Sequence, residues 1–120
     1  MATNKKYCVE GLAQWVLWPI VYVSVMNEDG TPVTGLTKSN FKIGRIGNGA
    51  QWVEVTVTSV SSQGASHGFY SLLVKNANNA DWNFFQDRIF TVEVSKSIGR
   101  GDRSTAFRGQ CFAPNHSHTT

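Results

Sequence analysis

Flat aromatic rings and amide side chains are the residues of this chain whose types and spacing could bind a ligand. The 120 residues include four tryptophans, which is generous for the core of one small β-domain. Trp82 and Phe84 flank a polar segment, residues 76–83, that also carries Asn78 and Asn79. Rings beside amides can stack on sugars and hydrogen-bond their hydroxyl groups, and they suit protein interfaces equally well. The same rings could instead cover the ends of a hydrophobic core.

Trp52 is a further candidate because of its place in an alternating run. Val53, Val55 and Val57 share one face of an expected strand, since strand side chains alternate with period two. Trp52 has the opposite parity, so its side chain is expected to point outward. A ligand-binding surface is therefore predicted at Trp52, Asn78, Asn79, Trp82 and Phe84.

The titratable residues do not form a catalytic pattern. His67 lies in a Ser/Gly turn, and His116 and His118 lie near the end of the chain, with no nucleophile motif beside them. Glu54 and Glu93 occupy solvent-facing strand positions. A catalytic triad needs a nucleophile and a base held in fixed geometry by rigid elements. We therefore expect no enzymatic activity, no cofactor and no metal site.

Two cysteines, Cys8 and Cys111, lie near opposite ends of the sequence. The first and last strands of a β-sandwich can lie side by side, so a disulfide could join them. In the chain-entropy model, such a bridge over about a hundred residues stabilises by up to about 4–5 kcal/mol. The alternative is two buried thiols in a reducing compartment.

A tripeptide, Arg100-Gly101-Asp102, matches the integrin-binding motif and falls between two expected strands. Exposure on a loop is what such recognition needs, so these residues form a candidate adhesion loop. Glycine and aspartate are also ordinary turn residues, which explains the tripeptide without any ligand.

The charges do not indicate nucleic-acid binding. The net charge is +3, but the basic residues are scattered and interrupted by acids: Asp87 precedes Arg88, and Asp102 lies between Arg100 and Arg103. Nucleic acid favours a concentrated basic stripe. No apolar run is long enough for a membrane span, and no secretory signal is evident. We therefore expect a protein that stays in the cytoplasm of its producer or leaves by a signal-free route.

The elements that must position these residues are expected to be strands. Alternating or apolar runs bounded by turn residues predict strands at residues 6–9, 14–26, 39–44, 52–60, 68–75, 84–96 and 105–112. Seven or eight strands in this length predict one β-sandwich domain over residues 1–112. Residues 113–120 are expected to form a C-terminal tail.

The second expected strand is apolar on both faces. Ile20, Tyr22 and Met26 lie opposite the alternating valines of the same strand. Strands of this kind are covered on both sides, either by loops or by another subunit. Ile20, Tyr22 and Met26 are therefore predicted to form an interface with a second copy of the chain or with a protein partner.

One segment carries a resemblance to a known family. The pattern D-G-x-P-V-x-G-L followed by N-F resembles the early strands of bacterial immunoglobulin-like modules; its residues here are Asp29, Gly30, Pro32, Val33, Gly35, Leu36, Asn40 and Phe41. The resemblance implies an Ig-like Greek-key β-sandwich without shared catalytic residues. It favours a non-enzymatic structural or binding module. A carbohydrate-binding, lectin-like module is the alternative, and a signal-free effector or toxin acting on host cells is the third hypothesis.

Overall fold

The computed structural model describes residues 3–15, 19–46, 52–61, 64–74, 88–98 and 105–116. These residues form an all-β protein, as predicted. Its eight strands are β1 (Thr3–Trp15), β2 (Pro19–Asn27), β3 (Phe41–Ile46), β4 (Trp52–Val55), β5 (Val57–Ser61), β6 (Phe69–Val74), β7 (Ile89–Ile98) and β8 (Thr105–Pro114). Two single-turn 3-10 helices, η1 (Lys38–Asn40) and η3 (Ala65–His67), accompany them. Within these ranges no helix is long and apolar enough to cross a membrane.

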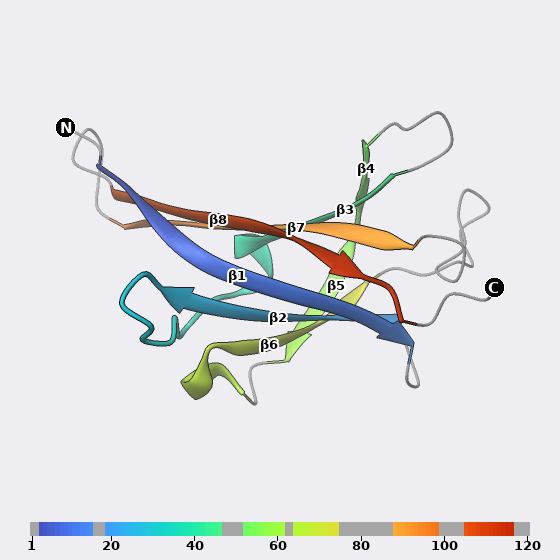
Figure 1. The fold of residues 1–120 in the computed structure, drawn as a ribbon, viewed down its shortest axis with the longest axis horizontal. Helices are drawn as coiled ribbons and strands as arrows, with labels where there is room; N and C mark the ends of the chain where they lie inside the picture. Colours follow the sequence, from blue (N-terminus) through green and yellow to red (C-terminus); the bar gives the residue numbers. More distant parts are fainter. Residues whose placement is uncertain are drawn as a thin grey trace.

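The strands form one mixed sheet in the order β4-β3-β7-β8-β1-β2-β6-β5, which curls into a nearly barrel-like shape (Figure 1). Strand β1 joins the two halves of the sheet, β4-β3-β7-β8 and β2-β6-β5. Its residues 3–6 pair in parallel with residues 105–108 of β8, and its residues 7–15 pair antiparallel with β2. At the other side of the molecule only Thr56 separates β4 from β5. The sheet therefore comes close to closing on itself.

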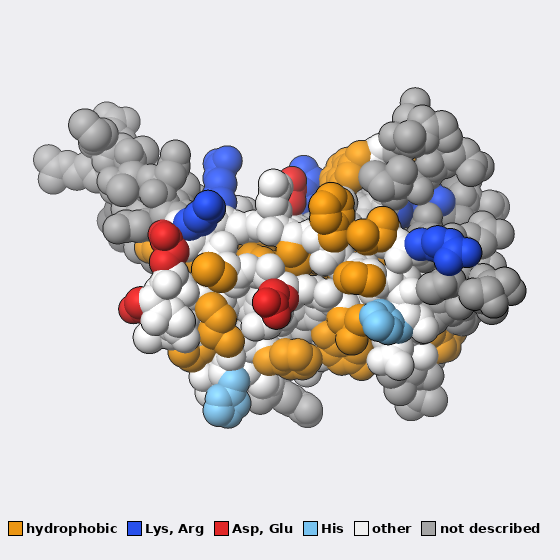
Figure 2. All heavy atoms as spheres, viewed as in Figure 1, with side chains coloured by type: hydrophobic (Ala, Val, Ile, Leu, Met, Phe, Trp, Pro, Cys, Tyr) orange, Lys and Arg blue, Asp and Glu red, His pale blue; other side chains and the backbone are white. Residues whose placement is uncertain are grey.

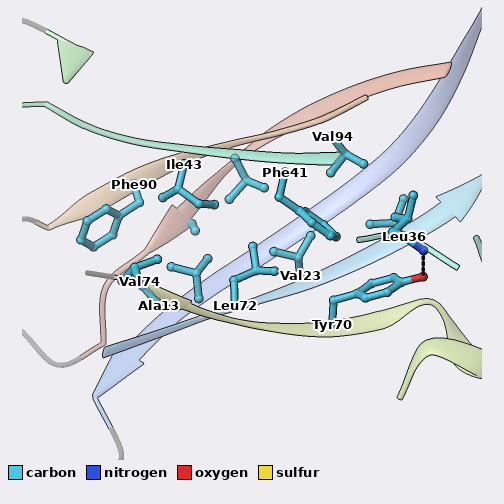
Figure 3. Packing of buried hydrophobic residues seen from close by; sticks show 14 of the residues in the cluster. Ala13, Val23, Leu36, Phe41, Ile43, Tyr70, Leu72, Val74, Phe90 and Val94 are labelled. Atoms are coloured by element: carbon cyan, nitrogen blue, oxygen red, sulfur yellow. Dashed lines mark hydrogen bonds between the residues drawn. The ribbon is translucent and has the colours of Figure 1, made fainter. Parts of the chain in front are cut away.

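The core is built from the inward side chains of the alternating strands. Figure 3 shows Ile43 and Phe90 on one wall facing Leu72 and Val74 on the other. Each large apolar side chain removed from water in this way contributes roughly 1.5–3 kcal/mol. On β2 and β7 every second residue points inward, and these residues are fully or almost fully buried: Val21, Val23, Val25, Phe90, Val92 and Val94.

The segment that crosses from β2 to β3 is fastened to β6 by one tyrosine. The Tyr70 hydroxyl donates to the carbonyl oxygen of Val33 at 2.7 Å and accepts from the amide of Leu36 at 3.3 Å; the second bond is drawn in Figure 3. Gly35, between these contacts, has φ +74°, a left-handed conformation that favours glycine. Residues of the D-G-x-P-V-x-G-L pattern therefore shape and anchor this crossing.

The turn that precedes it is closed by a carboxylate. Asp29 accepts hydrogen bonds from the Thr31 amide at 3.0 Å and from its hydroxyl at 2.6 Å, and these bonds lower the pKa of the Asp29 carboxyl. Gly30, with φ +88°, supplies the positive φ that the turn needs.

Several strand limits differ from those expected. Residues 6–9 and 14–26 were predicted as separate strands, but β1 runs from Thr3 to Trp15 and pairs with β2 as a hairpin in which Trp15 lies opposite Pro19. Pro19 is the first residue of β2. Its place at a strand end removes the need for a ladder donor.

The run at residues 52–60 is not one strand. It is interrupted at Thr56, so that β4 pairs with β3 and β5 pairs with β6. Only Val55 of its valines is fully inward, while Val53 is 42% exposed. Residues 52–60 therefore contribute one strand to each half of the sheet.

The last strand continues past residue 112, where the domain was expected to end. Strand β8 reaches Pro114, and both Ala113 and Asn115 are buried. The amide of His116 donates to the carbonyl oxygen of Ala13 at 2.9 Å, which ties this segment to β1. Residues 113–116 therefore belong to the folded domain.

Candidate binding groove on the outer face

The outer face of β3, β7 and β8 carries polar, charged and aromatic side chains in two rows. Gly44, Thr91 and Phe112 occupy paired positions on these three strands, and Lys42, Glu93 and Gln110 form the next row. Neighbouring strands lie about 4.8 Å apart and successive rows on one face about 6.8 Å apart. The two rows therefore form one compact surface that faces away from the core.

Trp52 reaches this surface from β4 and lies across Gly44. A β-carbon at residue 44 would overlap the indole ring, so the ring rests directly on the backbone of β3. The indole Nε1 donates to the Thr91 hydroxyl at 2.7 Å. Lys42 Nζ lies 5.6 Å from the ring centroid, within range of a cation–π contact. The ring is fixed by three neighbours, yet Trp52 remains 43% exposed.

Phe112 stands on the other side of Thr91 and is 66% exposed, the most exposed of the large apolar residues in the described ranges. Between the two rings lies a hollow of about 370 Å³ whose lining includes Thr91, Glu93 and Gln110. Two aromatic side chains therefore flank a hydroxyl, a carboxylate and an amide. This combination can stack on an apolar ring face and hydrogen-bond to groups at its edge.

A wider groove of about 800 Å³ continues from this hollow. The two share Glu93 and Gln110, and the wider groove is also lined by Lys6, Glu28, Lys42 and Arg108. Lys42 forms an ion pair with Glu54 of β4, with Nζ and Oε1 3.8 Å apart; both side chains are exposed, so the pair contributes little to stability. The groove thus runs from an aromatic end to a basic end.

The predicted ligand-binding residues fall into two groups. Trp52 points outward, as its parity predicted. Asn78, Asn79, Trp82 and Phe84 lie outside the described residues, as do Arg100, Gly101 and Asp102 of the candidate adhesion loop. Phe112 and Thr91 were not predicted, although strand parity alone places both on the face opposite the buried Val92 and Ala113.

The predicted interface residues lie on a different face, the outer side of β1, β2 and β6. Ile20, Tyr22 and Met26 are all partly exposed. The Tyr22 and Phe69 rings stack with centroids 5.9 Å apart, and Phe69 is 43% exposed. Figure 2 shows apolar side chains over these strands with an acidic side chain among them. A shallow hollow there is lined by Glu10, Leu12, Tyr22 and Phe69 among others.

The two cysteines are free thiols, so the disulfide considered above is not formed in the structure. Cys8 is exposed, whereas Cys111 is partly buried, pairs with the buried Val92 and packs against the core. The two side chains therefore occupy opposite faces of the sheet. Burial, with a smaller effect from the Glu10 charge, raises the pKa of the Cys111 thiol to about 11.

Among the described residues, no three His, Cys, Asp or Glu side chains gather where they could hold a metal ion. No protein-family model matches the chain, and a comparison with curated proteins finds no match either.

Proposed function

We propose that this chain is a non-enzymatic, immunoglobulin-like binding module that binds carbohydrate on the outer face of β3, β7 and β8. The strand order supports the immunoglobulin-like assignment. The four strands β1-β2-β6-β5 correspond to the A-B-E-D sheet of that fold, and β3-β7-β8 correspond to its C-F-G sheet.

The observation that carries the carbohydrate assignment is the fixed indole of Trp52. The ring rests on Gly44 and its nitrogen is bonded to Thr91, so little freedom is lost when a ligand stacks on it. The apolar C–H face of a sugar fits such a ring. The Glu93 carboxylate can accept hydrogen bonds from sugar hydroxyl groups, and the Gln110 amide can both accept and donate them. The exposed Phe112 on β8, across the hollow from Trp52, can contact an adjoining sugar.

The direct test is glycan-array screening followed by calorimetry with Trp52→Ala. Removal of the indole should weaken binding of any saccharide hit at least about tenfold, equivalent to about 1.4 kcal/mol. Val53→Ala is the matched control, because Val53 is equally exposed but lies on the opposite face of β4. It should bind like the wild type. Unchanged affinity in a folded Trp52→Ala variant, or no glycan hit at all, would contradict the proposal.

A second candidate function is self-association through the outer face of β1, β2 and β6. The stacked Tyr22 and Phe69 rings, together with Leu12, leave an apolar surface on this side of the sheet. A second copy of the chain could cover it, because a two-fold interface brings the same patch of both subunits together.

Sedimentation velocity over a range of concentrations tests this second function. The wild type should sediment faster as its concentration rises, and Phe69→Lys should remain a monomer. Phe112→Lys, which changes an exposed phenylalanine on the other face, should still associate. A wild-type monomer at every concentration would rule out self-association.

A further inference from the structure

We infer that the saccharide bound in the groove is acidic, with its carboxylate or sulfate group held by Lys6 and Arg108. This inference rests on the proposed carbohydrate function and specifies the class of ligand. It concerns the basic end of the 800 Å³ groove, away from the aromatic end.

Two cations lie side by side at the basic end of the groove. Lys6 of β1 and Arg108 of β8 are direct partners in the parallel ladder, and both side chains are exposed and line the groove. Like charges on directly opposite strand positions repel and destabilise the pair. The ion pair found in the described part of the chain joins Lys42 to Glu54 and involves neither of them. An anion between the two would turn repulsion into attraction.

The chemistry of the two side chains suits an oxyanion. A guanidinium can donate two parallel hydrogen bonds to the oxygens of a carboxylate or sulfate, and an ammonium adds a compact charge with rotatable donors. The side chains start from strands about 4.8 Å apart, so both can reach the same group.

The side chains along the groove follow a defined order. The aromatic row at Thr91 is followed by Glu93 with Gln110, and then by Ser95 paired with Arg108. Four residues along β7 cover roughly 13 Å, a length that a short oligosaccharide can span. A ligand that fits this order has a stacking ring at one end, hydroxyl groups in the middle and a negative charge at the other end.

The acidic residues of the groove argue against a uniformly charged polymer. Glu93 lies at the centre, and Glu28, the residue after the Asn27 that pairs with Tyr7, lies at the Lys6 end, so a ligand with an anion at every position would meet repulsion. Lys42 has the Glu54 carboxylate 3.8 Å away, whereas Lys6 and Arg108 have each other as direct ladder partners. The basic pair thus stands out as the anion-binding position.

The test is calorimetry with three oligosaccharides of the same backbone: a neutral one, one with a uronic acid, and one with a sulfate ester. The wild type should bind at least one acidic form about tenfold more tightly than the neutral form at low salt, and added NaCl should reduce that preference. The two acidic arms decide between carboxylate and sulfate.

Variants separate this inference from the proposed function. The double variant Lys6→Gln/Arg108→Gln should lose the preference for the acidic form but keep its affinity for the neutral form. Lys38→Gln, which removes an exposed cation outside the groove, should keep the preference. Trp52→Ala should weaken binding of all three saccharides.

The remaining outcomes contradict either the acidic-ligand inference alone or the carbohydrate function as well. Equal affinity of the wild type for neutral and acidic forms, or a preserved preference in the double variant, overturns the acidic-ligand inference and leaves the carbohydrate function standing. A single-stranded DNA of equal charge that binds as tightly as the acidic saccharide also overturns it. If none of the three saccharides binds, both fail.

Discussion

At the scale of single residues, Gly44 decides where the Trp52 indole lies. Only the absence of a β-carbon at residue 44 lets the ring rest on the backbone of β3 and reach the Thr91 hydroxyl. This is a case in which glycine is required by close approach and not by its backbone angles.

Gly44→Ala should therefore displace the indole, break its bond to Thr91 and weaken glycan binding about as much as Trp52→Ala. The lost hydrogen bond should lower the free energy of unfolding by about 1 kcal/mol. Tryptophan fluorescence, calorimetry and urea unfolding measure the three effects.

The control is a double-mutant cycle. In a Trp52→Ala background, Gly44→Ala should change glycan affinity no further, because both substitutions remove the same contact. Additive losses would show that residue 44 acts independently of the indole.

Parity was enough to predict that Trp52 points outward. It could not reveal Gly44 beneath the ring, because that contact depends on the register of β4 against β3. Nor could it place Lys6 beside Arg108, since they are 102 positions apart in sequence and meet only through the parallel pairing of β1 with β8.

At the scale of elements, β1 pairs first with β8 and then with β2, and a glycine on β8 lies where the pairing changes. Gly109 follows the last β1–β8 pair, Lys6 with Arg108. A β-carbon on Gly109 would lie 2.6 Å from the Tyr7 carbonyl oxygen and 2.6 Å from Val9 Cγ2. The backbone of β1 would have to move to admit it.

Gly109→Ala should therefore lower the free energy of unfolding by about 2–3 kcal/mol, as overpacking against a fixed backbone does. Gly11→Ala is the matched change in β1, since its β-carbon would meet Ala113 Cβ at 3.1 Å, Cys111 Sγ at 3.2 Å and the Tyr22 carbonyl oxygen at 3.5 Å, all farther than the contacts at Gly109. It should cost less than about 1 kcal/mol. Urea unfolding with unchanged m-values compares them, and equal losses would contradict this account.

The alternation of apolar and polar residues predicted where strands occur, but it did not predict where several of them begin and end. Residues 16–18 are Val-Leu-Trp, without glycine, proline or asparagine, so the sequence gives no sign that the chain reverses between Trp15 and Pro19. Likewise, the alternation of residues 52–60 continues through Thr56, where the chain passes from one half of the sheet to the other. Both errors have the same cause: tertiary pairing determined where the strands stop.

At the scale of the whole molecule, the pairing of the first strand, β1, with the last, β8, joins the two halves of the sheet. Strand β8 lies between β7 and β1, and Asn115, the residue that follows β8, bridges Ala13 near the far end of β1. The composition and strand pattern predicted an all-β domain but placed its end at residue 112, because the polar residues that follow resemble a tail.

A chain that ends at Phe112 should be less stable than the full chain by about 3 kcal/mol. It loses the buried Ala113, the buried Asn115, and the backbone bonds from Asn115 to Arg88 and from His116 to Ala13. Urea unfolding of both chains measures the difference. Identical midpoints would mean that residues 113–120 form the dispensable tail that the sequence suggested.

The break at Thr56 has a consequence for aggregation. A long, flat edge strand offers unpaired N–H and C=O groups on which another chain can template. Here the strand order ends on β4 and β5, which are four and five residues long and are separated in the chain by Thr56. Edge-to-edge growth into fibrils from these two strands would therefore start from short segments.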